Sequence, residues 1–130
     1  MERLRQRADF LAVATGARVN SAAFTLQSRR RDNSGRDLGP ARVGFTVTKK
    51  NGTATERNRI RRRLREAVRR LDVGADSMAM QPQHDYVLVG RRAALTADFD
   101  AMLDDLRSAL KRLERQGSKL QAAKSSRKPD

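Results

Sequence analysis

Residues 42–66 read RVGFTVTKKNGTATERNRIRRRLRE, a stretch that predicts a strand, a turn and a helix in direct succession. Over residues 42–48, apolar side chains alternate with polar or small ones, as in a strand that buries one face in a core. The segment Thr53-Ala-Thr-Glu56 matches the capping box that opens many helices. Apolar residues then recur at helical spacing, so we expect a helix over residues 54–71. Its buried stripe consists of Ile60, Leu64, Ala67, Val68 and Leu71.

The expected helix is rich in arginine. Eight of the fourteen residues from Arg57 to Arg70 are Arg, and Glu66 is the only acid. On a helical projection, one polar sector holds Asn58, Arg61, Arg62, Arg65 and Arg69, and the opposite flank holds Arg59, Arg63 and Arg70. Arginines four residues apart repel one another and cost a helix about a few tenths of a kcal/mol per pair. The planar guanidinium suits phosphate, because it can donate to two oxygens at once. We therefore predict a phosphate-binding surface rather than a merely solvated face.

The charge of the whole chain favours the same kind of partner. Lys and Arg outnumber Asp and Glu by 29 to 15, which gives a net charge of +14. Residues 1–70 hold 19 basic and 6 acidic residues, whereas residues 71–130 hold 10 and 9. Such an uneven distribution presents one strongly positive surface, as expected of a protein that binds a polyanion.

Several function classes are excluded by the residue types. The chain has no Cys and a single His, His84, which rules out a disulfide framework, a thiolate zinc site, a Cys nucleophile and a pair of His ligands. No apolar run has the length of a membrane span, and the first residues lack the apolar region of a signal peptide. We expect a soluble, cytoplasmic protein. The one dense acidic group is interpreted as the start and surface of a helix rather than as a metal site; it comprises Asp98, Asp100, Asp104 and Asp105.

The segments before residue 42 predict a helix followed by strands. A short helix is expected over residues 7–14, with Gly16 able to end it. A loosely alternating pattern over residues 17–30 predicts a strand that is interrupted near Asn20. Residues 31–40 are rich in turn formers and are interpreted as a loop.

The segments after the arginine helix predict one strand and one long helix. A loop is expected over residues 74–83 and a buried strand over residues 86–89. Thr96 is the expected N-cap of a last helix that Gly117 ends, and residues 118–130 are interpreted as a basic, disordered tail. The domain then spans residues 1–117. It is an α+β, two-layer sandwich of order α-β-β-(β)-α-β-α.

The strand motif over residues 42–50 and the run RNRIRRxxRE over residues 57–66 resemble the bacterial ribonuclease P protein family. A looser resemblance extends to Asp9-Phe10, Gly16, Phe24 and residues 85–91. It covers most of residues 4–115. For the fold, the resemblance implies a small mixed sheet with a left-handed βαβ crossover, which general handedness rules disfavour.

For function, the resemblance implies an RNA-binding subunit of the endonuclease ribonuclease P, a ribonucleoprotein that removes 5′ leaders from precursor tRNA. The RNA subunit holds the catalytic Mg²⁺ ions and carries out the hydrolysis. The protein binds the leader and stabilises the ribozyme, without a catalytic residue, metal or cofactor of its own. Its implied partners are ribonuclease P RNA and precursor tRNA, with no membrane and no obligate protein partner. The scarcity of catalytic side chains in the basic half agrees with this implication.

The resemblance also implies two groups of binding residues. Those expected to contact the RNA subunit are Lys49, Lys50, Arg57, Asn58, Arg59, Arg61, Arg62, Arg65 and Arg69. Those expected to contact the leader, in a cleft between the first helix and the sheet, are Arg5, Arg7, Phe10, Phe24, Arg29 and Arg42. Phe10 and Phe24 are either platforms on which bases stack or core residues. Ala14 and Gln27 stand where aromatics are frequent in the family, so polar contacts should hold more of the leader.

Two other functions share parts of this sequence pattern. A structural, ribosomal-type protein that binds rRNA would also carry a basic helix and a large positive charge. A nuclease made of protein alone would cleave precursor tRNA without any RNA subunit.

Overall fold

The structure of the chain is a computed structural model that describes residues 2–4, 6–30, 41–73 and 84–126. The loops expected over residues 31–40 and 74–83 lie outside these residues. The elements, in chain order, are β1 (Glu2–Arg3), α1 (Arg7–Ala14), β2 (Ala17–Asn20), β3 (Phe24–Arg30), β4 (Arg42–Thr46), the 3-10 helix η1 (Lys49–Asn51), α2 (Ala54–Val73), β5 (His84–Gly90), the 3-10 helix η2 (Arg92–Leu95) and α3 (Phe99–Ser126).

The strands form one mixed sheet in the order β1-β4-β5-β3-β2. β3 runs antiparallel to both β2 and β5, whereas β4 is parallel to β5 and to β1. α2 joins the parallel neighbours β4 and β5, so these three elements form a βαβ unit. The α+β class and the predicted order of elements are confirmed, with the strand region of residues 17–30 split in two and the short strand β1 added before α1. The hand of the crossover stays a prediction.

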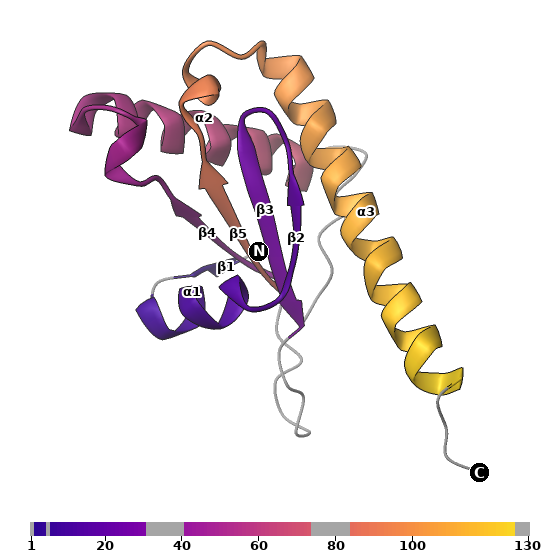
Figure 1. Ribbon diagram of the computed structural model, residues 1–130. Helices are drawn as coiled ribbons and strands as arrows, with labels where there is room; N and C mark the ends of the chain where they lie inside the picture. The colour runs from indigo at the N-terminus through magenta and orange to yellow at the C-terminus, as the bar shows by residue number, and fades with distance from the viewer. Residues whose placement is uncertain (1, 5, 31–40, 74–83, 127–130) are drawn as a thin grey trace.

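Helices cover the two faces of the sheet unequally (Figure 1). α2 and α3 pack on one face, where a Cβ added to Gly90 of β5 would meet the side chains of Ile60 and Leu64. α1 lies on the opposite face, where a Cβ added to Gly44 of β4 would lie 2.5 Å from the ring of Phe10. The main core therefore fills the layer between the sheet and α2 and α3. A smaller cluster under α1 contains Leu4, Val13 and Val87, with Phe10 and Val89 packed against it.

The capping box at the start of α2 forms as the sequence predicts. The backbone N–H of Thr53 donates to Oε1 of Glu56 at 2.9 Å, and the N–H of Glu56 donates to Oγ1 of Thr53 at 3.2 Å. The predicted apolar stripe is buried throughout, from Ile60 to Leu71. α2 is thus anchored by its inner face, which leaves its polar sectors outward.

Both predicted ends of the last helix are wrong. Thr96 lies at the end of η2, and Asp98 caps α3 instead, because its Oδ2 accepts from the N–H of Ala101 at 3.1 Å. α3 also runs past Gly117 to Ser126. A glycine inside a helix costs only about 1 kcal/mol relative to Ala, and helix-forming residues stand on both sides of this one. The boundary at residue 117 stays a prediction as the limit of the domain.

Candidate nucleic-acid interface

The outward side of α2 carries arginines without acidic partners. Arg59, Arg62 and Arg65 are exposed, and Arg61 is half-buried. Within the described ranges, no ion pair reaches any of these four side chains. Arg61 donates to Oδ1 of the neighbouring Asn58 at 2.6 Å, which orients both side chains along the same sector. Three of these arginines, Arg61, Arg62 and Arg65, belong to the sector predicted from the helical projection, and Arg59 belongs to the opposite flank. All four keep their positive charge available to a ligand.

Arg65 lies where α2 passes over the edge of the sheet. Its guanidinium carbon is 5.7 Å from the ring centre of Phe45 on β4, a cation–π distance. Desolvation, with repulsion from Arg3 and Arg61, lowers the pKa of Arg65. Arg3 belongs to β1, a strand that the sequence pattern did not reveal, so the structure adds one cation to the predicted surface. Repulsion among these charges would be relieved by a bound anion.

The other flank of α2 is tied to the protein itself. Arg63 donates to the backbone carbonyls of Ala94 and Ala97, at 2.5 and 2.6 Å, and so binds the end of η2. Arg70 lies over the ring of Phe99, 4.9 Å from its centre. These two arginines stabilise the packing of α2 against the segment that leads into α3.

Among the described residues, Arg69 is the one predicted RNA contact on this helix that pairs with an acid. Its Nε and Nη2 donate to the two oxygens of Glu66, at 3.1 and 3.0 Å. These hydrogen bonds raise the pKa of Arg69 and lower that of Glu66. The Arg69 side chain remains exposed, so the pair leaves its outer surface accessible. Its contact with RNA stays a prediction.

The approach to α2 adds further cations. Lys49 and Lys50 are exposed on η1, which packs against α2. Arg57 is half-buried in the first turn of α2, and its Nε is buried without a hydrogen-bond partner in the described part of the chain. The predicted RNA-binding residues on η1 and α2 thus share one region of the fold, and their contacts with RNA stay predictions.

Arg42, predicted to contact the leader, is half-buried and ion-paired with this chain's own acids. Its Nε and Nη2 donate to the two carboxylate oxygens of Asp85 on β5, both at 2.8 Å, and its Nη2 is 3.7 Å from Asp9 of α1. Strand register explains the pairing, because Arg42 lies directly beside Asp85 in the sheet. Arg42 thus joins α1, β4 and β5, and because 27% of its side chain is exposed, its contact with the leader stays a prediction.

Phe24, predicted as either a base platform or a core residue, is a core residue. It is 0% exposed and belongs to the main cluster under α2 and α3. Phe10 is half-buried above Gly44, which has no side chain to exclude its ring. The platform assignment is therefore wrong for Phe24, and for Phe10 it stays a prediction.

The remaining predicted leader contacts are cations at the edges of the α1 side. Arg7 at the start of α1 and Arg29 near the end of β3 are both exposed. Arg5 lies outside the described residues. The exposure of Arg7 and Arg29 does not test whether they contact the leader, so both assignments stay predictions.

A polar cluster on the face of the sheet that carries α1 was missed from the sequence. Nη2 of Arg91, just after β5, donates to Oδ1 of Asn20 at 3.2 Å and to Oγ1 of Thr25 at 3.0 Å. Thr25 also donates to Oδ1 of Asn20 at 2.9 Å. The register aligns Asn20, Thr25, Val89 and Thr46 across the sheet. The alternation over residues 42–48 predicted that Thr46 faces away from the core, but only the tertiary structure brings Arg91 to Asn20 and Thr25.

Two further properties bear on what the site can do. Among the residues with described placement, no three His, Cys, Asp or Glu side chains are grouped so as to hold a metal ion. None of the helices searched in that same part of the chain has the length and apolar content needed to cross a membrane.

Known proteins resemble this chain in both sequence and fold. Residues 1–114 match a family model described as Ribonuclease P. The ribonuclease P protein component of Brucella suis is 46% identical over 108 residues, which cover 80% of this chain and 74% of the relative. That of Bartonella quintana is 46% identical over 111 residues, which cover 84% and 80%. The solved RNase P protein from Thermotoga maritima has a TM-score of 0.66 at 31% identity, covering 86% of this chain and 97% of its own.

Proposed function

The chain belongs to the ribonuclease P protein family, and from this premise we propose that α2 and η1 bind the RNA subunit while the sheet face beside α1 binds the 5′ leader of precursor tRNA. As a member of this family, it is a subunit of the endoribonuclease ribonuclease P and acts in tRNA processing. The two binding roles are finer than family membership, and each rests on its own part of the structure.

One observation carries the proposal for the RNA subunit. Four arginines of α2, Arg59, Arg61, Arg62 and Arg65, have no acidic partner in the described part of the chain, and Arg3 adds to their charge. Each phosphate that such a cation neutralises releases condensed counterions from the RNA. A folded RNA with closely spaced phosphates is therefore the partner that gains most from this surface.

The leader proposal is supported by the polar cluster of Asn20, Thr25 and Arg91. The bonds to Asn20 and Thr25 fix the direction of the Arg91 side chain while leaving it exposed. Its remaining N–H donors, with the exposed Arg18 and Asn20, suit the phosphates and bases of a single strand. Such contacts do not require the stacking platforms that this chain lacks at Ala14 and Gln27.

The division of labour follows from the chemistry of the two partners. We propose that the RNA subunit binds the Mg²⁺ ions that hydrolysis requires, and that the protein supplies only fixed positive charge. Two RNAs repel each other through their phosphates, and divalent ions normally screen that repulsion. Cations of α2 and of the leader face would take over part of the screening. The protein should therefore matter most when Mg²⁺ is scarce.

Reconstitution with ribonuclease P RNA tests the proposal. At limiting Mg²⁺, the protein should raise the rate of precursor-tRNA cleavage, and the gain should shrink as Mg²⁺ is increased. Absence of any gain at limiting Mg²⁺ would overturn the proposal and would favour a structural, rRNA-binding role. Protein alone should leave precursor tRNA intact, because cleavage without the RNA would make the chain itself a nuclease.

The leader role has a separate readout. Replacement of Arg91 by Gln should weaken the binding of precursor tRNA to the holoenzyme and leave mature tRNA, which has no leader, unaffected. Equal losses for both substrates would remove Arg91 from the leader site. Three further expectations stay predictions: precursor tRNA as a partner, the lack of an obligate protein partner, and a cytoplasmic location.

A further inference from the structure

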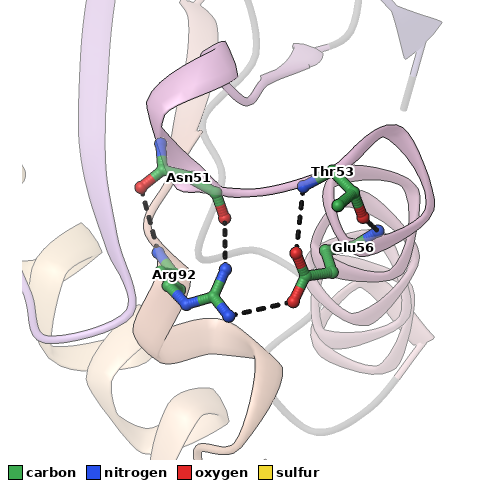
Figure 2. A network of polar contacts seen from close by, with 4 residues as sticks. All are labelled: Asn51, Thr53, Glu56 and Arg92. Atoms are coloured by element: carbon green, nitrogen blue, oxygen red, sulfur yellow. Dashed lines mark hydrogen bonds and ion pairs between the residues drawn. The ribbon is translucent and has the colours of Figure 1, made fainter.

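A network of polar contacts joins two loops that are about 40 residues apart in the chain (Figure 2). Arg92, at the start of η2, donates from Nη2 to Oε2 of Glu56 at 2.9 Å and from Nη1 to the backbone carbonyl of Asn51 at 3.2 Å. The N–H of Arg92 donates to Oδ1 of Asn51, also at 3.2 Å. Three bonds from Arg92 therefore tie the start of η2 to Asn51 of η1 and to Glu56 in the first turn of α2.

The turn itself is built around this network. Asn51 donates from Nδ2 to Oγ1 of Thr48 at 3.0 Å and to the carbonyl of Gly90 at 3.4 Å. Gly52 has a φ of 135°, a conformation that L side chains rarely adopt. A Cβ at Gly52 would lie 2.6 Å from Oε1 of Glu56 and 2.8 Å from Nη1 of Arg92. The turn thus requires glycine at position 52, because a side chain there would collide with both Glu56 and Arg92.

We propose that Arg92 and Glu56 are positioning residues for RNA binding: their ion pair, with Asn51, holds Lys49 and Lys50 in place beside the first turn of α2. The inference rests on the proposed binding of RNA by η1 and α2. It assigns Arg92 a role through other residues, although its own charge has the sign of an RNA contact.

The distribution of partners supports positioning. Both terminal nitrogens of Arg92 already have acceptors within the protein, as does its backbone N–H. Lys49 and Lys50 precede Asn51 on η1, are exposed, and have no hydrogen-bond or ion-pair partner for their side chains among the described residues. Lysine side chains are long and lose much rotamer freedom when they bind, so a fixed backbone beneath them reduces the cost of ordering. The network therefore orders the backbone beneath Lys49 and Lys50, while the charge of Arg92 itself stays bound within the protein.

Two substitutions separate positioning from simple charge. Arg92→Gln removes a positive charge and Glu56→Gln removes a negative one. If charge alone mattered, Glu56→Gln would strengthen binding to ribonuclease P RNA and Arg92→Gln would weaken it. If the network positions the cations, both variants should weaken binding, each by about three- to tenfold, because each breaks the same charge-assisted contact. The double variant should bind RNA with about the same affinity as the single variant that binds less tightly, because both substitutions break one shared contact.

Gln is chosen because variants with this side chain should still fold. Gln at position 56 can still accept from the N–H of Thr53, so the capping box of α2 survives. Melting temperatures without RNA should therefore stay close to that of the unsubstituted protein. Gly52→Ala provides a second route to the same result, since it displaces the network without changing any charge, and it should weaken RNA binding as well.

The slope of log K against log salt distinguishes the two mechanisms further. A positioning residue contacts no phosphate, so Arg92→Gln should lower affinity with little change in slope, whereas loss of a direct duplex contact lowers the slope by about 0.9. Arg112→Gln, which removes an exposed charge from α3, serves as the matched control and should change neither quantity. Stronger binding by Glu56→Gln, or a reduced slope for Arg92→Gln, would overturn the inference.

Failure of this inference can be told apart from failure of the proposed function. If Arg61→Ala and Arg65→Ala weaken RNA binding while Glu56→Gln and Gly52→Ala do not, only the positioning role is lost. If none of these variants affects RNA binding, the assignment of η1 and α2 as the RNA-binding surface is itself wrong.

Discussion

Arg42 donates two hydrogen bonds of 2.8 Å to the carboxylate of Asp85, although the two residues are 43 positions apart in the chain. Asp85 is only 3% exposed, and the same guanidinium is 3.7 Å from Asp9 on α1. The pair links a strand of the βαβ unit to its parallel neighbour and to the helix above them. Arg42, which was predicted to contact a ligand, therefore also stabilises the fold.

Replacement of Arg42 by Ala should destabilise the protein by about 2–3 kcal/mol, because it removes two charge-assisted hydrogen bonds from the buried Asp85 carboxylate. The value is set below that of a fully buried pair because Arg42 is partly exposed. Urea unfolding measures the loss. Arg112→Ala, an exposed position on α3 away from Asp85, is the control, and it should change stability by no more than about 0.5 kcal/mol. Equal stabilities of the two variants would contradict a structural role for Arg42.

Phe24→Ala should cost about 3–5 kcal/mol, since it empties space in the main core. Phe10→Ala should cost less, because Phe10 is only half-buried above Gly44. Chemical denaturation gives both values. The milder Phe24→Leu should keep the preference of the holoenzyme for precursor over mature tRNA. Loss of that preference at unchanged stability would restore Phe24 as a base platform.

The double variant Arg61→Ala/Arg65→Ala should weaken binding to ribonuclease P RNA and flatten its salt dependence. Each lost phosphate contact should reduce the slope of log K against log salt by about 0.9 on a duplex. Titrations at several salt concentrations measure this slope. Arg112→Ala removes a comparable exposed charge from α3 and should leave the slope unchanged. A slope equal to that of the unsubstituted protein would show that Arg61 and Arg65 face only water in the complex.

Two carboxylates give a prediction for acid stability. Hydrogen bonds from Arg92 lower the pKa of Glu56, and those from Arg69 lower the pKa of Glu66, in each case below the ordinary value of 4.5. A lowered folded-state pKa means that the stabilising contribution is fully present above pH 4.5 and is lost as the pH falls through the lowered value.

NMR titration of the side-chain carboxyl carbons should therefore give midpoints below 4.5 for both Glu56 and Glu66. In Arg92→Gln, the midpoint of Glu56 should move up while that of Glu66 stays in place, because the two carboxylates have separate partners. A midpoint of Glu56 that does not respond to this substitution would show that the ion pair is absent in solution.

Local elements of this fold are readable from neighbouring residues. The bounds of α1 agree with the predicted helix, and the capping box and apolar stripe of α2 form as expected. β4 begins at the predicted residue and ends at Thr46, two residues early. The failures at Thr96 and Gly117 also have local causes: Asp98 is a competing cap, and a single glycine costs too little to stop a helix with good formers on both sides.

The sequence by itself determined that the chain has an amphipathic arginine helix after an alternating strand, and so a basic surface, because helical and strand periodicities depend on residues within a few positions of one another. Only the tertiary structure decided how individual cations are used: Arg42 pairs with Asp85, Arg92 binds Glu56, and Arg3 joins the α2 surface. The reason is physical. These pairings depend on strand register and on how separate loops cross, and a guanidinium group has the same composition whether it meets a carboxylate of its own chain or a phosphate of another.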